Sequence, residues 1–125
     1  MDYEYILNNC LDEREFRNFV GTILTKNGFT SLEFDDVRLS DKLKNNNNDI
    51  IVYNKKDKYT IQTYLNKTIT TKEVEETIKD MEKEKVKFGI IITNTDVDSD
   101  LKDDAKSNNI EIWDKNKLLS LTKKY

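Results

Sequence analysis

Hydrophobic residues recur near the start of the chain at intervals of three and four residues, which form one stripe of an α-helix. These residues are Phe16, Phe19, Val20, Ile23 and Leu24. Asp12 and Glu15 have the spacing of a capping box at the start of this helix, and Gly28 supplies its end. A shorter apolar set within residues 3–10 predicts one or two preceding helical turns.

After residue 30 the pattern changes to alternating apolar positions, which predicts strands. Residues 32–39 alternate as a strand would, and a polar, asparagine-rich loop follows over residues 40–48. Two clearer strands cover residues 49–53 and 59–65. The polar segment between them is short enough only for a hairpin, so we expect these two strands to be antiparallel.

The hairpin fixes which side chains share a face of the sheet. With a four-residue loop, Tyr53 pairs with Lys58, and Asp49 then faces Gln62 across the ladder. Because side chains alternate along a strand, Asp49, Gln62 and Tyr64 are expected on one face. The opposite, more apolar face would carry Ile50, Val52, Ile61, Thr63 and Leu65.

Helices and strands alternate through the second half of the chain. The predicted elements are a helix over residues 71–86, a strand over 88–93, a short helix over 97–105, a strand over 110–113 and a closing helix around 118–121. Thr70 and Glu73 offer a second capping box. The continuous apolar run at 88–93 is typical of a central strand covered on both faces. The whole order predicts one α/β domain over residues 1–125, with a mixed sheet between helices.

Composition excludes several kinds of chemistry. The 125 residues contain no histidine, so a Ser-His-Asp triad or a His-ligated metal is ruled out. A single cysteine, Cys10, excludes an intrachain disulfide and a thiolate zinc cluster. Catalysis would depend on carboxylates, amides, lysines and hydroxyls with a hard cation such as Mg²⁺. Without a long apolar run or an apolar leader, we expect a soluble intracellular protein, cytoplasmic or nuclear according to its host.

A series of short motifs follows a recognisable order over residues 11–121. The motifs are Glu15-Phe16, Gly28-Phe29, Asp49, Ile61-Gln62-Thr63-Tyr64, Val74, Gly89-Ile90-Ile91-Ile92-Thr93, Ala105, and Ile110-Glu111-Ile112-Trp113-Asp114 with Leu118. This series resembles the Mrr-type branch of the PD-(D/E)XK restriction endonuclease-like fold. The resemblance implies the element order αβββαβαβα. The chain departs from the pattern in the reversed Glu-Phe order and in the asparagine tract that replaces a glycine-rich segment.

The resemblance also implies a site. Asp49 and Gln62 would hold Mg²⁺ or Mn²⁺, and Glu15 would be a third, helix-borne group, for hydrolysis of a phosphodiester. Tyr64 occupies the position of the usual lysine and supplies no cation near pH 7. Either the site is catalytically degenerate, or a relocated lysine serves it. Lys67 beyond the strand and Lys58 at its start are candidates if the backbone bends.

Simpler explanations stand beside these assignments. Asp49 could cap a loop, Gln62 could be a surface polar group and Glu15 is accounted for by the capping box. Tyr64 is more typical of a core aromatic. The lysines of the hairpin tip, Lys55, Lys56 and Lys58, form either a solvated turn or a phosphate contact.

The leading hypothesis is a nucleic-acid-acting domain with DNA as the expected partner and RNA as the alternative polymer. It would bind DNA and have degenerate or weak metal-dependent hydrolysis. A non-catalytic protein-interaction or assembly module on the same fold is the rival hypothesis, and an unrelated α/β domain is a third. A homodimer or a larger complex is compatible with each of them, and a membrane partner is not expected.

Overall fold

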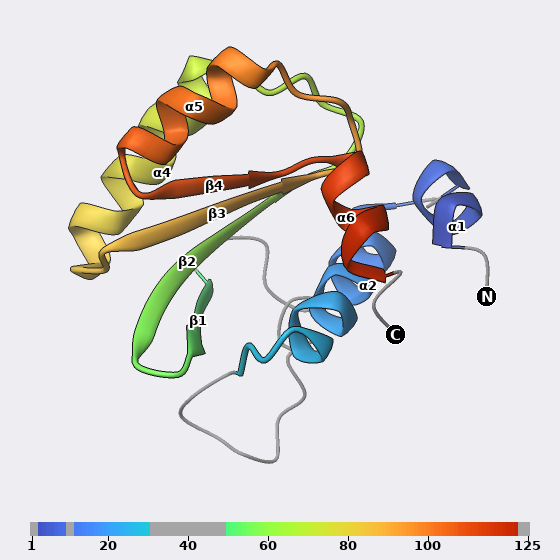
Figure 1. The fold of residues 1–125 in the computed structure, drawn as a ribbon, viewed down its shortest axis with the longest axis horizontal. Coiled ribbons are helices and arrows are strands. Elements are labelled where there is room, and N and C mark those ends of the chain that lie inside the picture. Colours follow the sequence, from blue (N-terminus) through green and yellow to red (C-terminus); the bar gives the residue numbers. More distant parts are fainter. Residues whose placement is uncertain (1–2, 10–11, 31–49, 123–125) are drawn as a thin grey trace.

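The computed structural model describes residues 3–9, 12–30 and 50–122. Its elements are helix α1 (Tyr3–Asn9), helix α2 (Glu13–Lys26), strand β1 (Ile50–Asn54), strand β2 (Asp57–Tyr64), helix α4 (Thr71–Glu84), strand β3 (Phe88–Thr93), helix α5 (Ser99–Ser107), strand β4 (Ile110–Trp113) and helix α6 (Lys115–Thr122) (Figure 1). These elements confirm the predicted α/β class and order. The strand predicted at residues 32–39, the polar loop that follows it, and the residues Cys10 and Asp49 lie outside the described ranges.

The described strands form a sheet in the order β1-β2-β3-β4. Strands β1 and β2 are antiparallel, and Tyr53 pairs with Lys58 as predicted. The ladder continues to Asn54 and Asp57, so the predicted four-residue loop is wrong and the loop has two residues. Lys55 in this loop has a φ of 59°, the left-handed conformation on which tight hairpin turns depend. Strands β3 and β4 add in parallel, which makes the sheet mixed.

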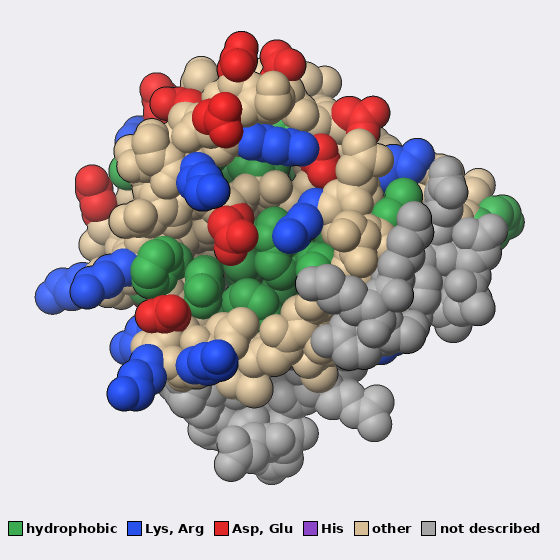
Figure 2. Space-filling view, in the orientation of Figure 1, with side chains coloured by type: hydrophobic (Ala, Val, Ile, Leu, Met, Phe, Trp, Pro, Cys, Tyr) green, Lys and Arg blue, Asp and Glu red, His purple; other side chains and the backbone are tan. Residues whose placement is uncertain are grey.

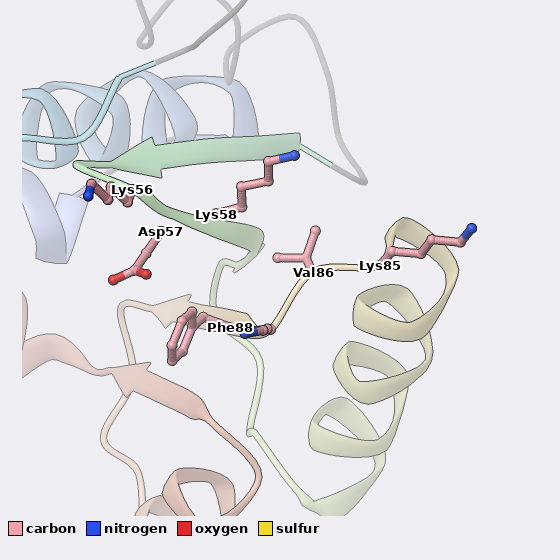
Figure 3. A pocket seen from close by; sticks show the side chains of 7 residues that line it. Lys56, Asp57, Lys58, Lys85, Val86 and Phe88 are labelled. Carbon is pink, nitrogen blue, oxygen red and sulfur yellow. The ribbon is translucent and has the colours of Figure 1, made fainter.

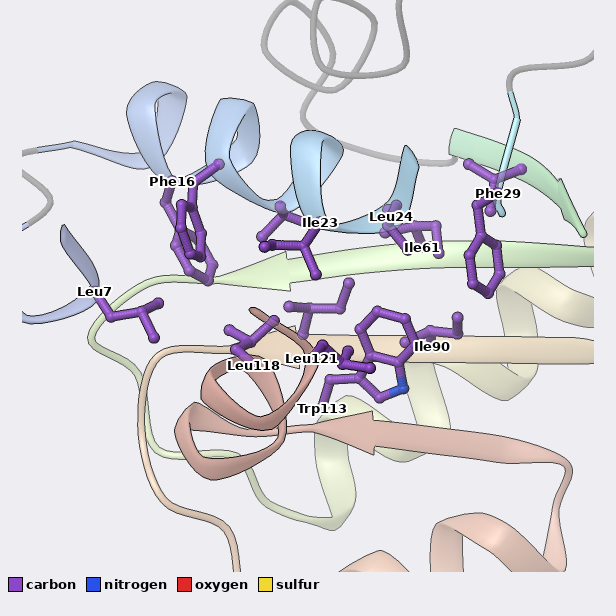
Figure 4. Packing of buried hydrophobic residues seen from close by; sticks show 14 residues of the cluster. Leu7, Phe16, Ile23, Leu24, Phe29, Ile61, Ile90, Trp113, Leu118 and Leu121 are labelled. Atoms are coloured by element: carbon purple, nitrogen blue, oxygen red, sulfur yellow. The ribbon is translucent and has the colours of Figure 1, made fainter. Parts of the chain in front are cut away.

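Helices α2 and α6 cover one face of the sheet (Figure 1). The predicted apolar stripe of α2 is buried there in full, against Val52, Ile61 and Ile90 of the strands. Trp113 and Phe29 meet in the same core edge to face, with ring centroids 5.8 Å apart (Figure 4). The predicted N-terminal cap of α2 is present, since the N–H of Glu15 donates to the Asp12 carboxylate at 2.8 Å.

Helices α4 and α5 cover the other face (Figure 1). Val74 and Met81 of α4 are buried there, and Ile78 is partly buried. The predicted capping box is present, because the Thr70 side chain accepts from the backbone of α4 while Glu73 accepts from the backbone N–H of Thr70. These side-chain caps fix the start of helix α4.

Within the described residues, no helix combines the length and apolar character that a membrane crossing needs.

Candidate functional site

Gln62 and Tyr64 project from β2 toward helix α4, on the face expected from the hairpin register. Gln62 is only 7% exposed, and its amide Nε2 donates a hydrogen bond to Asp80 Oδ2 at 2.5 Å. An ionised carboxylate can only accept, so Asp80 determines which end of the amide faces it. The amide oxygen of Gln62 is therefore the end left for another ligand.

The pKa of the Tyr64 phenol is raised well above its usual value. Burial of the side chain, together with the nearby carboxylates of Glu76, Glu73 and Asp80, raises its pKa to about 12. The phenol is consequently neutral at pH 7 and supplies neither a cation nor a phenolate nucleophile. Tyr64 alone does not replace the lysine of the family pattern.

Lys67 lies against Tyr64 because the chain turns back after β2. Asn66 has a φ of 56°, and its backbone N–H donates to Asn94 Oδ1 at 2.7 Å. The Asn94 side-chain amide donates in return to Asn66 Oδ1 at 2.9 Å. The Lys67 ammonium nitrogen then lies 5.0 Å from the centre of the Tyr64 ring, within the range of a cation–π contact.

The same ammonium group lies 3.8 Å from Glu73 Oε2. The Lys67 side chain is half exposed, whereas that of Glu73 is 2% exposed and also accepts from the Thr70 hydroxyl at 3.0 Å. The Lys67 side chain thus pairs with a buried carboxylate and remains accessible to solvent. A cation is present next to the position that Tyr64 occupies.

The other residues proposed from the sequence are placed differently. Glu15 is exposed in the first turn of α2, on the helix that covers the sheet face opposite Gln62. The structure therefore does not bring Glu15 and Gln62 together on one face. Asp49 lies outside the described residues, so its pairing with Gln62 and the ligand roles of both stay predictions.

The oxygen atom that Gln62 offers is of the type that binds a hard cation. Mg²⁺ and Mn²⁺ prefer oxygen ligands, and the oriented amide oxygen of Gln62 is one such ligand. Across residues 3–9, 12–30 and 50–122, no group of three or more acidic, cysteine or histidine side chains is arranged to hold a metal ion. Asp49 is therefore the residue on which a cation site with Gln62 would depend.

Sequence reasoning missed Asp80 and two lysines, Lys85 and Lys87. Asp80 follows Glu73 and Glu76 at helical spacing, which could have indicated a shared acidic stripe on α4. The hairpin lysines Lys56 and Lys58 line a pocket together with Lys85 and Lys87 (Figure 3). This grouping has no local signal, since the two segments are far apart in the sequence.

In the described part of the chain, the mixed four-stranded sheet between two pairs of helices has the element order expected of a restriction endonuclease-like fold, and Lys67 lies beside Tyr64 at the end of its second strand. A family model for the Mrr catalytic domain, described as a restriction endonuclease, matches residues 9–122. The chain therefore belongs to the Mrr-type restriction endonuclease family. A search of curated proteins finds no match.

Proposed function

We propose that this chain binds DNA and hydrolyses its phosphodiester bonds weakly, with Mg²⁺ or Mn²⁺. Membership of the Mrr family implies the DNA substrate. The observation that supports hydrolysis is the Lys67 ammonium group 5.0 Å from the Tyr64 ring, because it returns a positive charge to the position from which the usual lysine is missing.

In this proposal each residue has a separate task. Gln62 and Asp49 hold the cation, and Asp80 keeps the Gln62 amide oxygen directed toward it. Lys67 contacts the non-bridging oxygens of the phosphate and stabilises the charge that develops on them. The cation, when bound, supplies further charge neutralisation and lowers the pKa of a bound water.

The same contacts explain why hydrolysis is weak. Lys67 divides its charge between the substrate and Glu73, whose buried carboxylate is 3.8 Å away. Tyr64 stays neutral because its pKa is raised to about 12, so the phenol does not compensate. A site of this kind retains DNA binding more readily than fast chemistry.

Cleavage of plasmid DNA with Mg²⁺ or Mn²⁺ tests the proposal. Lys67→Ala is expected to lower the cleavage rate about a hundredfold, the usual loss when one charge-stabilising group is removed. Lys67→Arg should keep part of the activity because it keeps the charge. The matched control is Lys79→Ala, which removes an exposed lysine of α4 and should cleave like the wild type.

The site assignment is wrong if cleavage survives Asp49→Ala, or if Lys79→Ala and Lys67→Ala have equal effects. DNA that is bound with steep salt dependence but never cut would leave a DNA-binding pseudonuclease and refute hydrolysis. A protein that binds neither DNA nor RNA would instead support the interaction-module hypothesis.

A further inference from the structure

A pocket rich in lysine lies at the amino ends of β2 and β3, away from Gln62 and Tyr64. It has a volume of about 280 Å³. Its lining residues are Lys56, Asp57, Lys58, Lys85, Val86, Lys87 and Phe88 (Figure 3). In Figure 2, Lys and Arg side chains gather at the left around a hollow floored by hydrophobic side chains, where the hairpin and the start of β3 lie. The pocket is too small for most organic cofactors and has room for a phosphate group.

Two turns in the left-handed conformation bring these lysines together. The hairpin turn at Lys55, with a φ of 59°, carries Lys56 in the turn and Lys58 at the start of β2. Lys85 ends helix α4 with a φ of 57°, and its backbone N–H bonds to the last carbonyls of the helix. Val86 is buried directly after this turn and anchors the segment between the helix and β3. The lysines are therefore held on two fixed backbones.

Among the described residues, no carboxylate forms an ion pair with the lysines of this pocket. Lys56, Lys85 and Lys87 are exposed, and none of them has an ion pair with a carboxylate in the described part of the chain. Lys58 is likewise exposed, and its ammonium group lies 5.7 Å from the centre of the Tyr53 ring. Among the described residues that line the pocket, Asp57 is the single acidic one, against four lysines. This concentration of positive charge contrasts with the net charge of −3 for the whole chain.

Val86 and Phe88 form the apolar part of the pocket lining. Phe88 lines it and packs against Tyr59, with ring centroids 5.3 Å apart. These two residues are directly opposed in the parallel β2–β3 ladder. Tyr59 thus holds the Phe88 ring in place at the pocket, and an anion there meets cations whose backbones are already fixed.

We propose that this pocket binds the phosphodiester backbone of the DNA at a second point, separate from the site of hydrolysis. The inference rests on the proposed function, which supplies DNA as the partner. Lysine ammonium groups are effective phosphate ligands, and phosphate contacts position a duplex without reading its sequence. The pocket therefore sets how the duplex lies across the sheet.

The geometry relates the pocket to the candidate site. Lys58 and Gln62 lie on the same strand and the same face, four residues apart. At about 3.3 Å per residue, the two backbone positions are roughly 13 Å apart. A duplex advances about 3.4 Å per base pair, so the phosphate in the pocket would lie about four base pairs from the reacting phosphate.

The test measures binding of a fluorescent DNA duplex by anisotropy over a range of salt concentrations, in EDTA so that hydrolysis does not contribute. Lys58→Gln combined with Lys87→Gln removes two pocket charges. Each lost phosphate contact should reduce the slope of log affinity against log salt by about 0.9, so a reduction of about 1.8 is expected. The control combines Lys106→Gln with Lys117→Gln, exposed lysines of α5 and α6, and should keep the wild-type slope.

The inference is overturned if both double variants change the slope equally, or if the wild type does not bind DNA. It is also overturned if the pocket variant loses binding to polyglutamate or anionic vesicles while its DNA binding is unchanged. DNA binding that depends on the pocket in a protein that never cleaves would contradict only the hydrolysis proposal. Cleavage that depends on Lys67, with unchanged DNA binding by the pocket variant, would contradict only the pocket.

Discussion

Gly89 sits in β3 where helix α4 comes closest to the sheet, and its replacement by alanine gives a sharp test of that packing. A methyl group at this position would lie 2.7 Å from Thr77 Cγ2, closer than carbon atoms pack. It would also lie 3.2 Å from Met81 Sδ and 3.2 Å from Thr60 Oγ1. Because two of these neighbours belong to α4, either their side chains or the helix itself must shift to make room.

The expected cost of Gly89→Ala follows from overpacking. Adding a methyl group to a filled core lowers the free energy of unfolding by about 1–3 kcal/mol. For a domain of this size each kcal/mol lowers the melting temperature by about 3–5 °C. Thermal unfolding followed by circular dichroism should therefore show a melting temperature roughly 3–15 °C below that of the wild type, and urea unfolding should show the loss of free energy directly.

A second substitution shows whether the cause is the close contact. Thr77→Ser removes Cγ2 and keeps the hydroxyl, which donates to the Glu73 carbonyl oxygen at 2.9 Å. Alone it should cost about 0.8 kcal/mol, the value of one buried methyl group. Combined with Gly89→Ala it should recover much of the lost stability. The explanation fails if Gly89→Ala is as stable as the wild type, or if the two losses simply add.

Two further predictions concern ionisable groups. The Tyr64 pKa is raised from 10.0 to about 12, so on raising the pH the unfolded chain loses this proton before the folded protein does. The contribution of Tyr64 to the free energy of unfolding should therefore be complete below pH 10 and decline as the pH rises toward 12. Tyr64→Phe should show a smaller alkaline loss in thermal unfolding, and an equal loss would contradict the assignment. The Asp114 carboxylate caps helix α6 by accepting a hydrogen bond from the Lys117 backbone N–H at 3.0 Å. The same carboxylate, with a side chain 3% exposed, forms an ion pair with Lys102 at 2.6 Å. Asp114→Ala should lower the free energy of unfolding by about 2–3 kcal/mol, and Asp114→Asn by less because the cap is kept; equal losses in urea unfolding would argue against the cap.

The parts of the fold that could be predicted are those with local causes. The capping box of Thr70 and Glu73 involves residues three apart, and the pairing of Tyr53 with Lys58 follows from a short polar segment between alternating strands. The stripe on α2 is also local, because helical periodicity alone determines which of its residues are buried. Only the loop length was wrong, since it depends on whether Lys55 adopts a positive φ.

The candidate site was less predictable because contacts between distant residues assemble it. Gln62 meets Asp80 eighteen residues later, and Asn66 meets Asn94 twenty-eight residues later. The second contact accompanies the turn that returns Lys67 to Tyr64, and no periodicity in the sequence specifies it. The sequence could therefore name Lys67 as a candidate without showing how it reaches the strand.

The fluorescence of Trp113 can report on one side of the sheet. It is the single tryptophan of the sequence, is 4% exposed, and packs with Phe29 on the side of α2 and α6. Gln62 and Tyr64 face the opposite side, toward α4. Intrinsic tryptophan fluorescence therefore reports on the α2 and α6 side of the sheet, which Phe88 of the lysine pocket also reaches through the rings of Tyr59 and Phe29. An emission change when a cation binds at Gln62 would show that the sheet transmits the event from one face to the other.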